Sequence, residues 1–409
     1  RRSTEYETGV KKISKTKKNT RITTEKELQI FLKAIKGQLV AVMLKEKEAS
    51  LFGGGMEAVG LATETAAREI EWNLSTGPVL LTWLADREQS KLVYDWKGMW
   101  HILSHVGASL QGVEADLLLL AYVVGESGKL DLETLCESHV GRSLAGANLA
   151  ENTAMLFAIH RALEEKMGRI VQEQPGQHTV RTILEEMELP LVPVLFAMEQ
   201  AGITLKKAVF TELSQEIDKN LKQVEREIFK LAGRDFNLNS PKQLAEILFV
   251  DLAIPTGNIK KNKTGFSTAS TELEKLRADY PIVALIEEYR ELFKLKTTYV
   301  DVLPGMVGQD GRLHTRYDQA VAATGRLSSN DPNLQNIPIR TEWGQRRREG
   351  FVAAPGKKLV GADYSQIELR IAAHLSGDQT MIEAFQNNED IHRTTASVVH
   401  GVKPEERTA

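Results

Sequence analysis

Apolar positions follow two different patterns along the chain. Between Thr24 and about Met167, short apolar runs at 38–44 and 79–84 alternate with helical stretches at 116–124 and 147–167. This alternation is typical of an α/β layer domain. We predict such a domain in this part of the chain, closed by the turn at Pro175–Gly176.

The second pattern is the periodicity of long amphipathic helices. An apolar stripe with spacings of three and four residues indicates one long helix whose other face carries Glu, Lys and Gln; the stripe comprises Leu213, Ile217, Leu221, Val224, Ile228 and Leu231. Ser240 and Pro241 suit the N-cap and first position of the next helix. A further helix is expected from about Ile282 to Tyr299. Together these segments predict a helical subdomain.

Composition narrows the class of protein without identifying it. The chain has 409 residues, of which 42% are hydrophobic and 26% charged, enough apolar material for two or three domains of roughly 100–200 residues each. No run approaches the roughly 18 consecutive apolar residues of a membrane span. We therefore expect a cytoplasmic protein with no membrane partner. The single cysteine, Cys136, excludes an internal disulfide and a cysteine-based metal site.

The net charge of −3 neither indicates nor excludes a nucleic-acid partner, so a binding surface would have to be a local basic patch. Two Lys-rich clusters occur, one comprising Lys11, Lys12, Lys15, Lys17, Lys18 and Arg21, the other Lys260, Lys261 and Lys263. Such a run is more often a solvated face or linker than a binding site. Residues 1–20, which are poor in apolar side chains, are predicted to be a flexible linker.

The segment 359–370 carries the clearest candidate chemistry. Its sequence, LVGADYSQIELR, predicts a short apolar strand that ends at Asp363 and a helix that begins at about Ser365. A carboxylate at a strand end can hold Mg²⁺, which uses one or two protein carboxylates together with substrate phosphates and water. The alternative is that Asp363 only caps the following helix. The local pattern leaves both interpretations open.

Two flanking segments bear on this choice. Upstream, TGRLSSNDPNLQNIP at 324–338 is a loop rich in amides and hydroxyls with one Arg. Such a loop is suited to contacts with sugars, phosphates and minor-groove acceptors. Downstream, the segment at 390–393 begins a helix that could bring His392 near a triphosphate, although a lone His is usually structural.

Taken in this order, the three segments resemble family A DNA polymerases, and residues 363–370 match the family's motif A in every position. The resemblance is strong from about residue 290 onward and weak up to about residue 200. It implies a multidomain α/β and α+β fold. A ribonuclease H-like, exonuclease-type domain would occupy residues 21–172, a palm entry helix and helical thumb 173–300, and the first part of a polymerase palm 301–409.

The resemblance also implies roles for individual residues. Asp363 would bind two catalytic Mg²⁺ ions, with the backbone carbonyl of Tyr364 as a further ligand. Glu368 would be the steric gate that selects dNTP over rNTP, and Arg326 would contact the primer terminus from the minor groove. The nucleotide pocket would be formed by Gln366, Ile367, Glu368 and His392. The other implied DNA contacts are Ser329, Asn333, Gln335, Asn336, Asn262, Lys263, Lys296 and Thr297.

The exonuclease-type domain departs from the family at its metal-binding positions. The resemblance requires an Asp-x-Glu pair on the first strand and two further aspartates, but the aligned residues are Met43, Lys45, Met99 and Asn152. Methionine offers no hard oxygen ligand and lysine repels a cation, so we predict a domain that has kept the fold and lost the nuclease. The nearby carboxylates leave an alignment shift of one or two residues open; they are Glu46, Asp95 and Asp116.

The family's fingers helix, and its His-Asp-Glu turn with a second metal-binding aspartate, do not occur in the sequence. We expect a fragment of a monomeric DNA-directed DNA polymerase that acts on primer–template DNA and dNTPs in replication and repair. The 409-residue chain alone is expected to bind primer–template without extending it. Two alternatives are a non-catalytic DNA-binding fragment and an active 3′–5′ exonuclease, which the misplaced carboxylates disfavour.

Overall fold

The computed structural model of the chain describes residues 21–47, 55–145, 148–176, 178–262, 265–337, 342–389 and 391. The predicted linker at 1–20 lies outside the described residues, and so do Lys263 and His392. Contacts along the chain separate two compact units, Arg1–Val352 and Ala353–Ala409.

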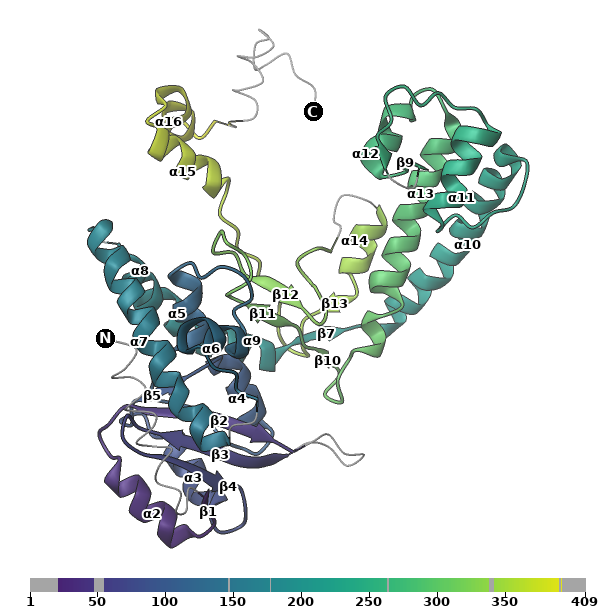
Figure 1. Cartoon of the computed structure of the whole chain (residues 1–409). Coiled ribbons are helices and arrows are strands. Elements are labelled where there is room, and N and C mark those ends of the chain that lie inside the picture. Colours follow the sequence, from purple (N-terminus) through teal and green to yellow (C-terminus); the bar gives the residue numbers. More distant parts are fainter. Residues whose placement is uncertain are drawn as a thin grey trace. The chain divides into compact units, whose positions relative to one another are not determined.

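The first unit begins with a six-stranded mixed sheet (Figure 1). Its strands are β1 (Arg21–Ile22), β2 (Val40–Glu46), β3 (Met56–Ala62), β4 (Ala67–Glu71), β5 (Lys91–Val93) and β6 (Val113–Asp116), in the order β1-β4-β3-β2-β5-β6. Strand β2 runs antiparallel to β3 and parallel to β5, and β5 runs parallel to β6. The carboxyl ends of β5 and β6 therefore meet at one edge of the sheet, which is where polar side chains of the two strands can interact.

Six helices pack with this sheet, and together they form what we name the α/β layer domain, residues 21–173. They are α2 (Glu25–Ala34), α3 (Gly77–Leu84), α4 (Trp96–Ser104), α5 (Leu117–Val123), α6 (Leu132–Val140) and α7 (Leu149–Glu173). Helix α7 lies so close to β3 that a Cβ on Gly60 would sit 2.0 Å from Thr153 Oγ1. The predicted layer architecture is confirmed. Of the two apolar runs, 40–44 lies in β2, whereas 79–84 lies in α3, which Pro78 helps to start.

A mainly helical part follows in the same unit. Its elements are α8 (Val180–Ile183), η1 (Leu184–Glu188), α9 (Leu189–Ala201), β7 (Ile203–Leu205), α10 (Lys207–Ala232), α11 (Pro241–Glu246), η2 (Ile247–Asp251), β8 (Lys261–Asn262), β9 (Gly265–Phe266), α12 (Ser270–Leu273), η3 (Glu274–Leu276), α13 (Pro281–Leu295), η4 (Lys296–Val300) and η5 (Leu303–Gly305). The predicted helix at 282–299 is thus α13 extended by η4. Ser240 caps α11 and Pro241 begins it, as predicted.

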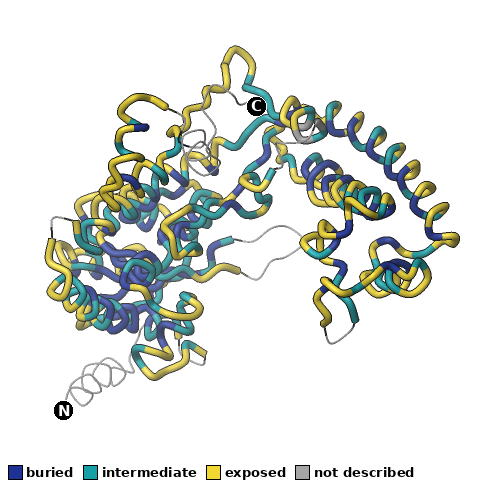
Figure 2. Tube along the Cα trace, turned by 90° about the horizontal axis from the view of Figure 1, so that it is seen from above, coloured by how far each residue is buried: buried dark blue, intermediate teal, exposed yellow. Residues whose placement is uncertain are grey.

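Helix α10 carries the predicted apolar stripe and packs it into the core shared with α13. Figure 2 shows buried and exposed residues alternating along these long helices. One member of the stripe was predicted wrongly, because Leu231 is 46% exposed. Ala232, four residues after the buried Ile228, continues the buried face instead and ends the helix before Gly233.

Short strands complete the first unit. Strands β10 (Arg312–Leu313) and β13 (Phe351–Val352) flank β7 in an antiparallel sheet, and β11 (Arg316–Asp318) pairs with β12 (Ser328–Asn330). Helix α14 (Glu342–Arg348) is tied to α10 by an Arg346 Nη2–Glu216 Oε1 hydrogen bond of 2.8 Å. The hairpin of β11 and β12 presents the loop that contains Arg326.

The second unit contains α15 (Ile367–Ser376) and α16 (Gln379–Gln386). The predicted strand ending at Asp363 is not formed, and residues 357–364 run without regular secondary structure. A strand requires a neighbour to complete its backbone hydrogen bonds, and the described residues of this unit provide none. Among the described residues, no helix is both long and apolar enough to cross a membrane.

Candidate functional site

Asp363 lies in the second unit, on the segment that leads into α15. It is exposed, and the residue at the N-cap of α15 is Gln366, in the left-handed region at φ 53°. Among the described residues, no side chain caps the start of this helix. Asp363 is therefore not the cap of α15. This removes the alternative interpretation of Asp363 and leaves an accessible carboxylate three residues before the N-cap.

Arg370 holds the turn between Asp363 and α15 in place. Its Nε donates to the carbonyl oxygen of Ser365 at 2.9 Å, and its guanidinium lies 4.6 Å from the centre of the Phe385 ring in α16. Glu368 lies in the first turn of α15, where a carboxylate suits the helix dipole. Arg370 belongs to the matched motif at 363–370, but the motif alone did not indicate this bracing role.

The loop after β12 is built by its own polar side chains. Ser329 Oγ lies 2.7 Å from Thr315 Oγ1 and accepts from Leu334 N at 3.0 Å. Asn333 Oδ1 accepts from the backbone N–H groups of Gln335 and Asn336, both at 3.1 Å. Ser329 has no exposed surface, so we do not propose it as a DNA contact; its hydroxyl stabilises the loop instead.

Among the predicted DNA contacts of this region, three have exposed side chains, as a binding role requires: Arg326, Gln335 and Asn336. Gln335 nevertheless accepts a hydrogen bond from Ser329 N at 3.2 Å, and the Asn336 carbonyl accepts one from Tyr299 Oη at 2.8 Å. The predicted binding residues of the upstream loop thus belong to one short segment, whose later part is held by hydrogen bonds from Ser329 and Tyr299.

The predicted DNA contacts in the helical part differ in how free their side chains are to bind. Asn262 is exposed on β8, and Thr297 is exposed while its hydroxyl donates to the Phe293 carbonyl at 2.8 Å. The side chain of Lys296 is already paired with two carboxylates. Its Nζ lies 3.3 Å from Asp218 and 2.9 Å from Asp301, and its side chain is 15% exposed. A phosphate contact from Lys296 would have to displace these two carboxylates.

A buried carboxylate that sequence reasoning missed joins the α/β layer domain to the rest of the unit. Glu199 of α9 is 3% exposed; it pairs with Lys97 and His101, both of α4, and accepts from the backbone N of Tyr317 in β11 at 2.7 Å. Burial alone would raise the pKa of Glu199, but the hydrogen bonds from His101, Lys97 and Tyr317 outweigh it and lower the pKa. The sequence feature that could have indicated this buried carboxylate is a lone Glu within the apolar sequence of α9.

The positions aligned with nuclease carboxylates hold other interactions. Lys45 in β2 pairs across the sheet with Glu57 at 2.6 Å, which raises the pKa of Lys45. Met99 is buried in the core of the domain. Asp95, four residues earlier, lies beside Asp116 at the sheet edge where β5 and β6 end. The aligned Asn152 donates to the Leu144 carbonyl at 3.3 Å.

Asp95 and Asp116 cap helices. Asp116 accepts from the backbone N–H groups of Asp95 at 3.0 Å, Trp96 at 2.9 Å and Leu118 at 2.9 Å. Asp95 accepts from Gly98 N at 2.9 Å at the start of α4. Burial, and to a lesser extent the charge of Asp95, raise the pKa of Asp116 to about 7 despite these hydrogen bonds. The Asp116 carboxylate therefore already accepts hydrogen bonds from three backbone N–H groups.

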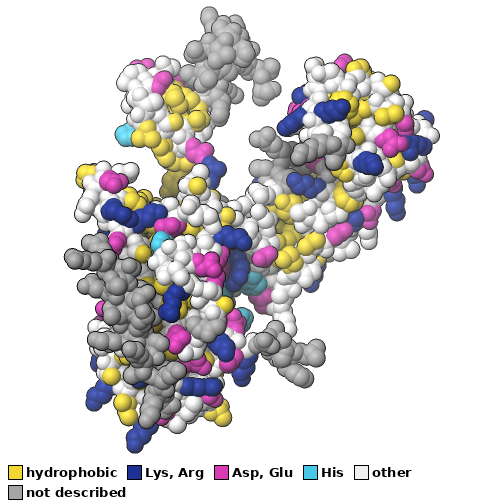
Figure 3. Space-filling model, in the orientation of Figure 1, with side chains coloured by type: hydrophobic (Ala, Val, Ile, Leu, Met, Phe, Trp, Pro, Cys, Tyr) yellow, Lys and Arg dark blue, Asp and Glu magenta, His cyan; other side chains and the backbone are white. Residues whose placement is uncertain are grey.

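No group of three or more His, Cys, Asp or Glu side chains among the described residues could hold a metal ion. Figure 3 shows Lys and Arg side chains interspersed with Asp and Glu on the visible face, in keeping with the small net charge. Cys136 is buried, and its burial raises the pKa of the thiol, so it is not a reactive nucleophile.

Comparison with known proteins relates these features to two family models. The model for DNA polymerase family A matches residues 207–409, which include Arg326, Asp363 and Glu368. The model for the ribonuclease H-like domain of DNA polymerase I matches residues 56–145, within the α/β layer domain. The two matches follow one another along the chain in the order that the sequence motifs predict.

Similar proteins cover most of the chain. DNA polymerase I of Lactococcus lactis is 41% identical over 333 residues, which are 77% of this chain and 37% of that protein. The thermostable DNA polymerase I of Thermus thermophilus is 46% identical over 297 residues, 71% of this chain and 34% of its own. The chain thus spans about a third of the length of these relatives.

A solved structure resembles most of the chain. The POL domain of Pol1 from M. smegmatis, in complex with DNA primer-template and dNTP, superposes with a TM-score of 0.83 at 34% sequence identity. The superposition covers 95% of this chain and 68% of that one.

Proposed function

The chain belongs to DNA polymerase family A, and on that premise we propose that it forms the primer-binding part and the first metal-binding carboxylate of a DNA-directed DNA polymerase. The observation that carries the proposal is the family match at 207–409, within which Arg326, Asp363 and Glu368 stand in the family's order. The likeness to a structure that holds primer-template and dNTP supports the same partners for this chain.

Asp363 is proposed as the carboxylate ligand of the catalytic magnesium ions, with the carbonyl oxygen of Tyr364 beside it. Both are oxygen donors, both residues are exposed, and Mg²⁺ is bound in proteins by few carboxylates that leave room for substrate phosphates and water. When bound, two Mg²⁺ ions neutralise charge on the transferred phosphoryl group and its attacking and leaving oxygens. The residue's own part is to hold a negative charge at an accessible position next to α15.

Other residues are proposed to orient the substrates. Glu368, in the first turn of α15, would lie against the sugar of the incoming dNTP, and Gln366, Ile367 and His392 would line the same pocket. Arg326 would contact acceptors in the minor groove at the primer terminus, which are shared by all base pairs in similar positions. The remaining proposed contacts to DNA are Asn333, Gln335, Asn336, Asn262, Lys263 and Thr297, whereas Lys296 is held by Asp218 and Asp301.

Binding of primer–template by the 409-residue chain tests this function. We expect binding that weakens steeply between about 50 and 200 mM salt, because basic side chains displace counterions from the phosphates. Fluorescence anisotropy of a labelled primer–template measures the dependence of log affinity on log salt. Lys263→Ala should reduce its slope by about 1.

Lys166→Ala is the matched control, since Lys166 Nζ is bound to Glu126 Oε1 at 2.9 Å within the α/β layer domain. It should leave the slope unchanged. Binding that does not respond to salt, or that responds equally to both substitutions, would contradict the proposed DNA contact.

We further propose that the α/β layer domain is not a nuclease. Lys45 stands where a metal-binding carboxylate is expected and pairs with Glu57, and the carboxylates of Asp95 and Asp116 are used as helix caps. Purified chain should therefore leave labelled single-stranded DNA intact in Mg²⁺ or Mn²⁺. Degradation that depends on Mn²⁺ and disappears with Glu46→Gln or Asp116→Asn would overturn this prediction.

A further inference from the structure

The segment at 319–327 connects β11 to β12 and carries Arg326 near its end. We name it the primer loop. Its residues from Ala323 to Arg326 are all exposed, and Val321 is 66% exposed. A loop with so little buried apolar surface gains little of its position from packing. Its conformation must then depend on hydrogen bonds.

Two hydrogen-bonding residues outside the loop hold its first half. Tyr122 of α5 donates its hydroxyl to the Ala322 carbonyl oxygen at 2.7 Å. Gln319 Nε2 donates to the Glu188 carbonyl at 3.0 Å and to Glu188 Oε2 at 2.6 Å. Tyr122 belongs to the α/β layer domain and Glu188 to η1, so the loop is anchored to elements far from it in sequence.

The Tyr122 bond falls on the turn that immediately precedes Arg326. The Ala322 carbonyl also accepts the backbone N–H of Gly325 at 3.2 Å, and Gly325 takes φ 78°, which favours glycine. One oxygen atom thus closes the turn and receives the tyrosine hydroxyl. Fixing that oxygen fixes the turn, and Arg326 is the next residue along the chain.

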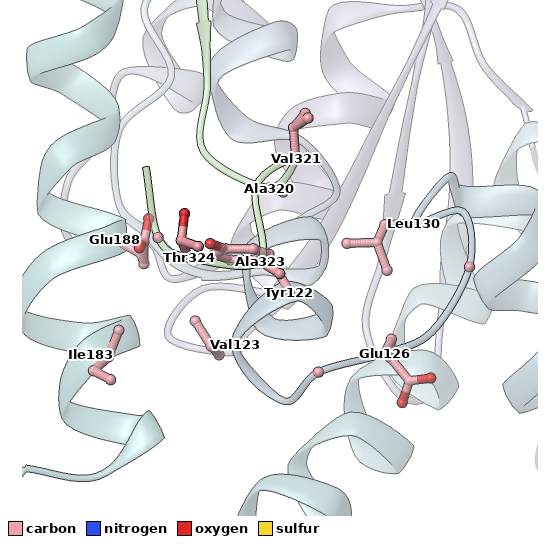
Figure 4. Close-up of a pocket in the computed structure, with 13 residues that line it drawn as sticks. Tyr122, Val123, Glu126, Leu130, Ile183, Glu188, Ala320, Val321, Ala323 and Thr324 are labelled. Carbon is pink, nitrogen blue, oxygen red and sulfur yellow. The ribbon is translucent and has the colours of Figure 1, made fainter. Parts of the chain in front are cut away.

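Side-chain packing does not hold the loop in addition to this hydrogen bond. Tyr122, Val123 and Leu130 on one side, and Ala320, Val321, Ala323 and Thr324 on the other, line a cavity of about 550 Å³. Figure 4 shows Tyr122 beside Ala323 and Thr324 at this cavity. Because the loop borders a solvent-open cavity and not a filled core, it has room to move once the hydroxyl is removed.

We propose that the α/β layer domain positions the primer loop through Tyr122, which makes Tyr122 a positioning residue for primer binding by Arg326. The inference rests on the proposed function, because it takes Arg326 as a primer contact. It gives the α/β layer domain a task in polymerisation that needs no nuclease chemistry: the domain supplies the fixed end of a hydrogen bond to the loop.

Tyr122→Phe removes the hydroxyl and keeps the ring. A hydrogen bond of this kind shifts a local opening equilibrium by roughly 2- to 13-fold. Hydrogen–deuterium exchange of the chain should therefore show amides of residues 320–327 exchanging faster by that factor, while amides of β2 and β3 remain unchanged. Tyr94→Phe is the matched control, since Tyr94 donates to the Leu130 carbonyl at 2.9 Å inside the α/β layer domain. It should leave the exchange of 320–327 unaltered.

Primer–template affinity of the chain, measured by anisotropy, gives the functional readout. Tyr122→Phe should weaken binding about two- to tenfold in the wild-type background and have no further effect in an Arg326→Ala background. Exchange at 320–327 that does not respond to Tyr122→Phe would overturn the inference, as would an equal loss of affinity in both backgrounds. If Arg326→Ala alone leaves affinity unchanged, the proposed role of Arg326 fails, and the inference fails with it even where the exchange result holds.

Discussion

Replacing Asp363 by Asn in a polymerase that contains this chain should raise the activation free energy of nucleotide addition by about 3–5 kcal/mol, which lowers kcat roughly 10²- to 10⁴-fold. The substitution keeps the size of the side chain and removes the negative charge that would hold the metal ions. Charge builds up on the transferred phosphoryl group only in the transition state, so the loss should fall on kcat, with little change in affinity for DNA. Rapid-quench measurement of single-nucleotide addition separates the two quantities.

Asp378→Asn is the matched control for this variant. Asp378 belongs to the same unit and caps α16 by accepting from Met381 N at 2.9 Å. Asn is an equally good cap, so kcat should remain normal. An Asp363→Asn protein with near-normal kcat would contradict the metal-binding role.

Glu368 lies five residues from Asp363, but Glu368→Ala should change the selection of the sugar and not mainly kcat. It opens space where the 2′-hydroxyl of a ribonucleotide would otherwise clash, so the ratio of rNTP to dNTP incorporation should rise. Competition between the two nucleotides for the same primer–template measures that ratio. An unchanged ratio would mean that Glu368 is not the gate.

Glu199→Gln should destabilise the first unit by about 3–5 kcal/mol, because it leaves the charge of Lys97 buried without its partner. The side chains of Lys97 and His101 are 12% and 17% exposed, so water replaces the lost carboxylate poorly. Urea unfolding followed by tryptophan fluorescence measures the loss. Trp100 stacks on Phe196 at 4.3 Å between α4 and α9, so it reports on this junction.

The effect should depend on pH with a defined sign. The pKa of Glu199 is lowered in the folded state from the ordinary value of 4.5. The stabilisation is therefore present above about pH 4.5 and is lost as the pH falls through the lower folded pKa. The difference between wild type and Glu199→Gln should shrink over that range.

Glu185→Gln is the control, since Glu185 is 55% exposed and pairs with Arg181 at the surface. It should change the free energy of unfolding by less than about 1 kcal/mol. Equal stability of Glu199→Gln and Glu185→Gln at pH 7 would show that the buried network does not hold the α/β layer domain to its neighbours.

Features that depend on local sequence were predicted well. The cap of α11 at Ser240 and the buried stripe of α10 follow from periodicity and capping chemistry, which act within a few residues. The order of the loop around Arg326 and the segment around Asp363 identified the family for the same reason, because each motif is continuous in sequence.

Features that depend on distant residues were missed. The segment before Asp363 has the composition of a strand, but a strand also needs a partner, which composition does not reveal. Ser329 and Lys296 sit among polar residues, yet the first is buried against Thr315 and the second is held by Asp218 and Asp301. The partners of Glu199 and Tyr122 lie about 100 and 200 residues away, so only the folded chain brings them together.

The most direct test of the central claim is addition of single nucleotides to a labelled primer by the full-length protein, with each dNTP offered separately. The proposed function predicts that only the dNTP complementary to the template is added, that addition requires Mg²⁺ and stops with a chelator, and that Asp363→Asn slows it roughly 10²- to 10⁴-fold. Addition that is independent of the template or of Mg²⁺, or that survives Asp363→Asn at the normal rate, would contradict the claim.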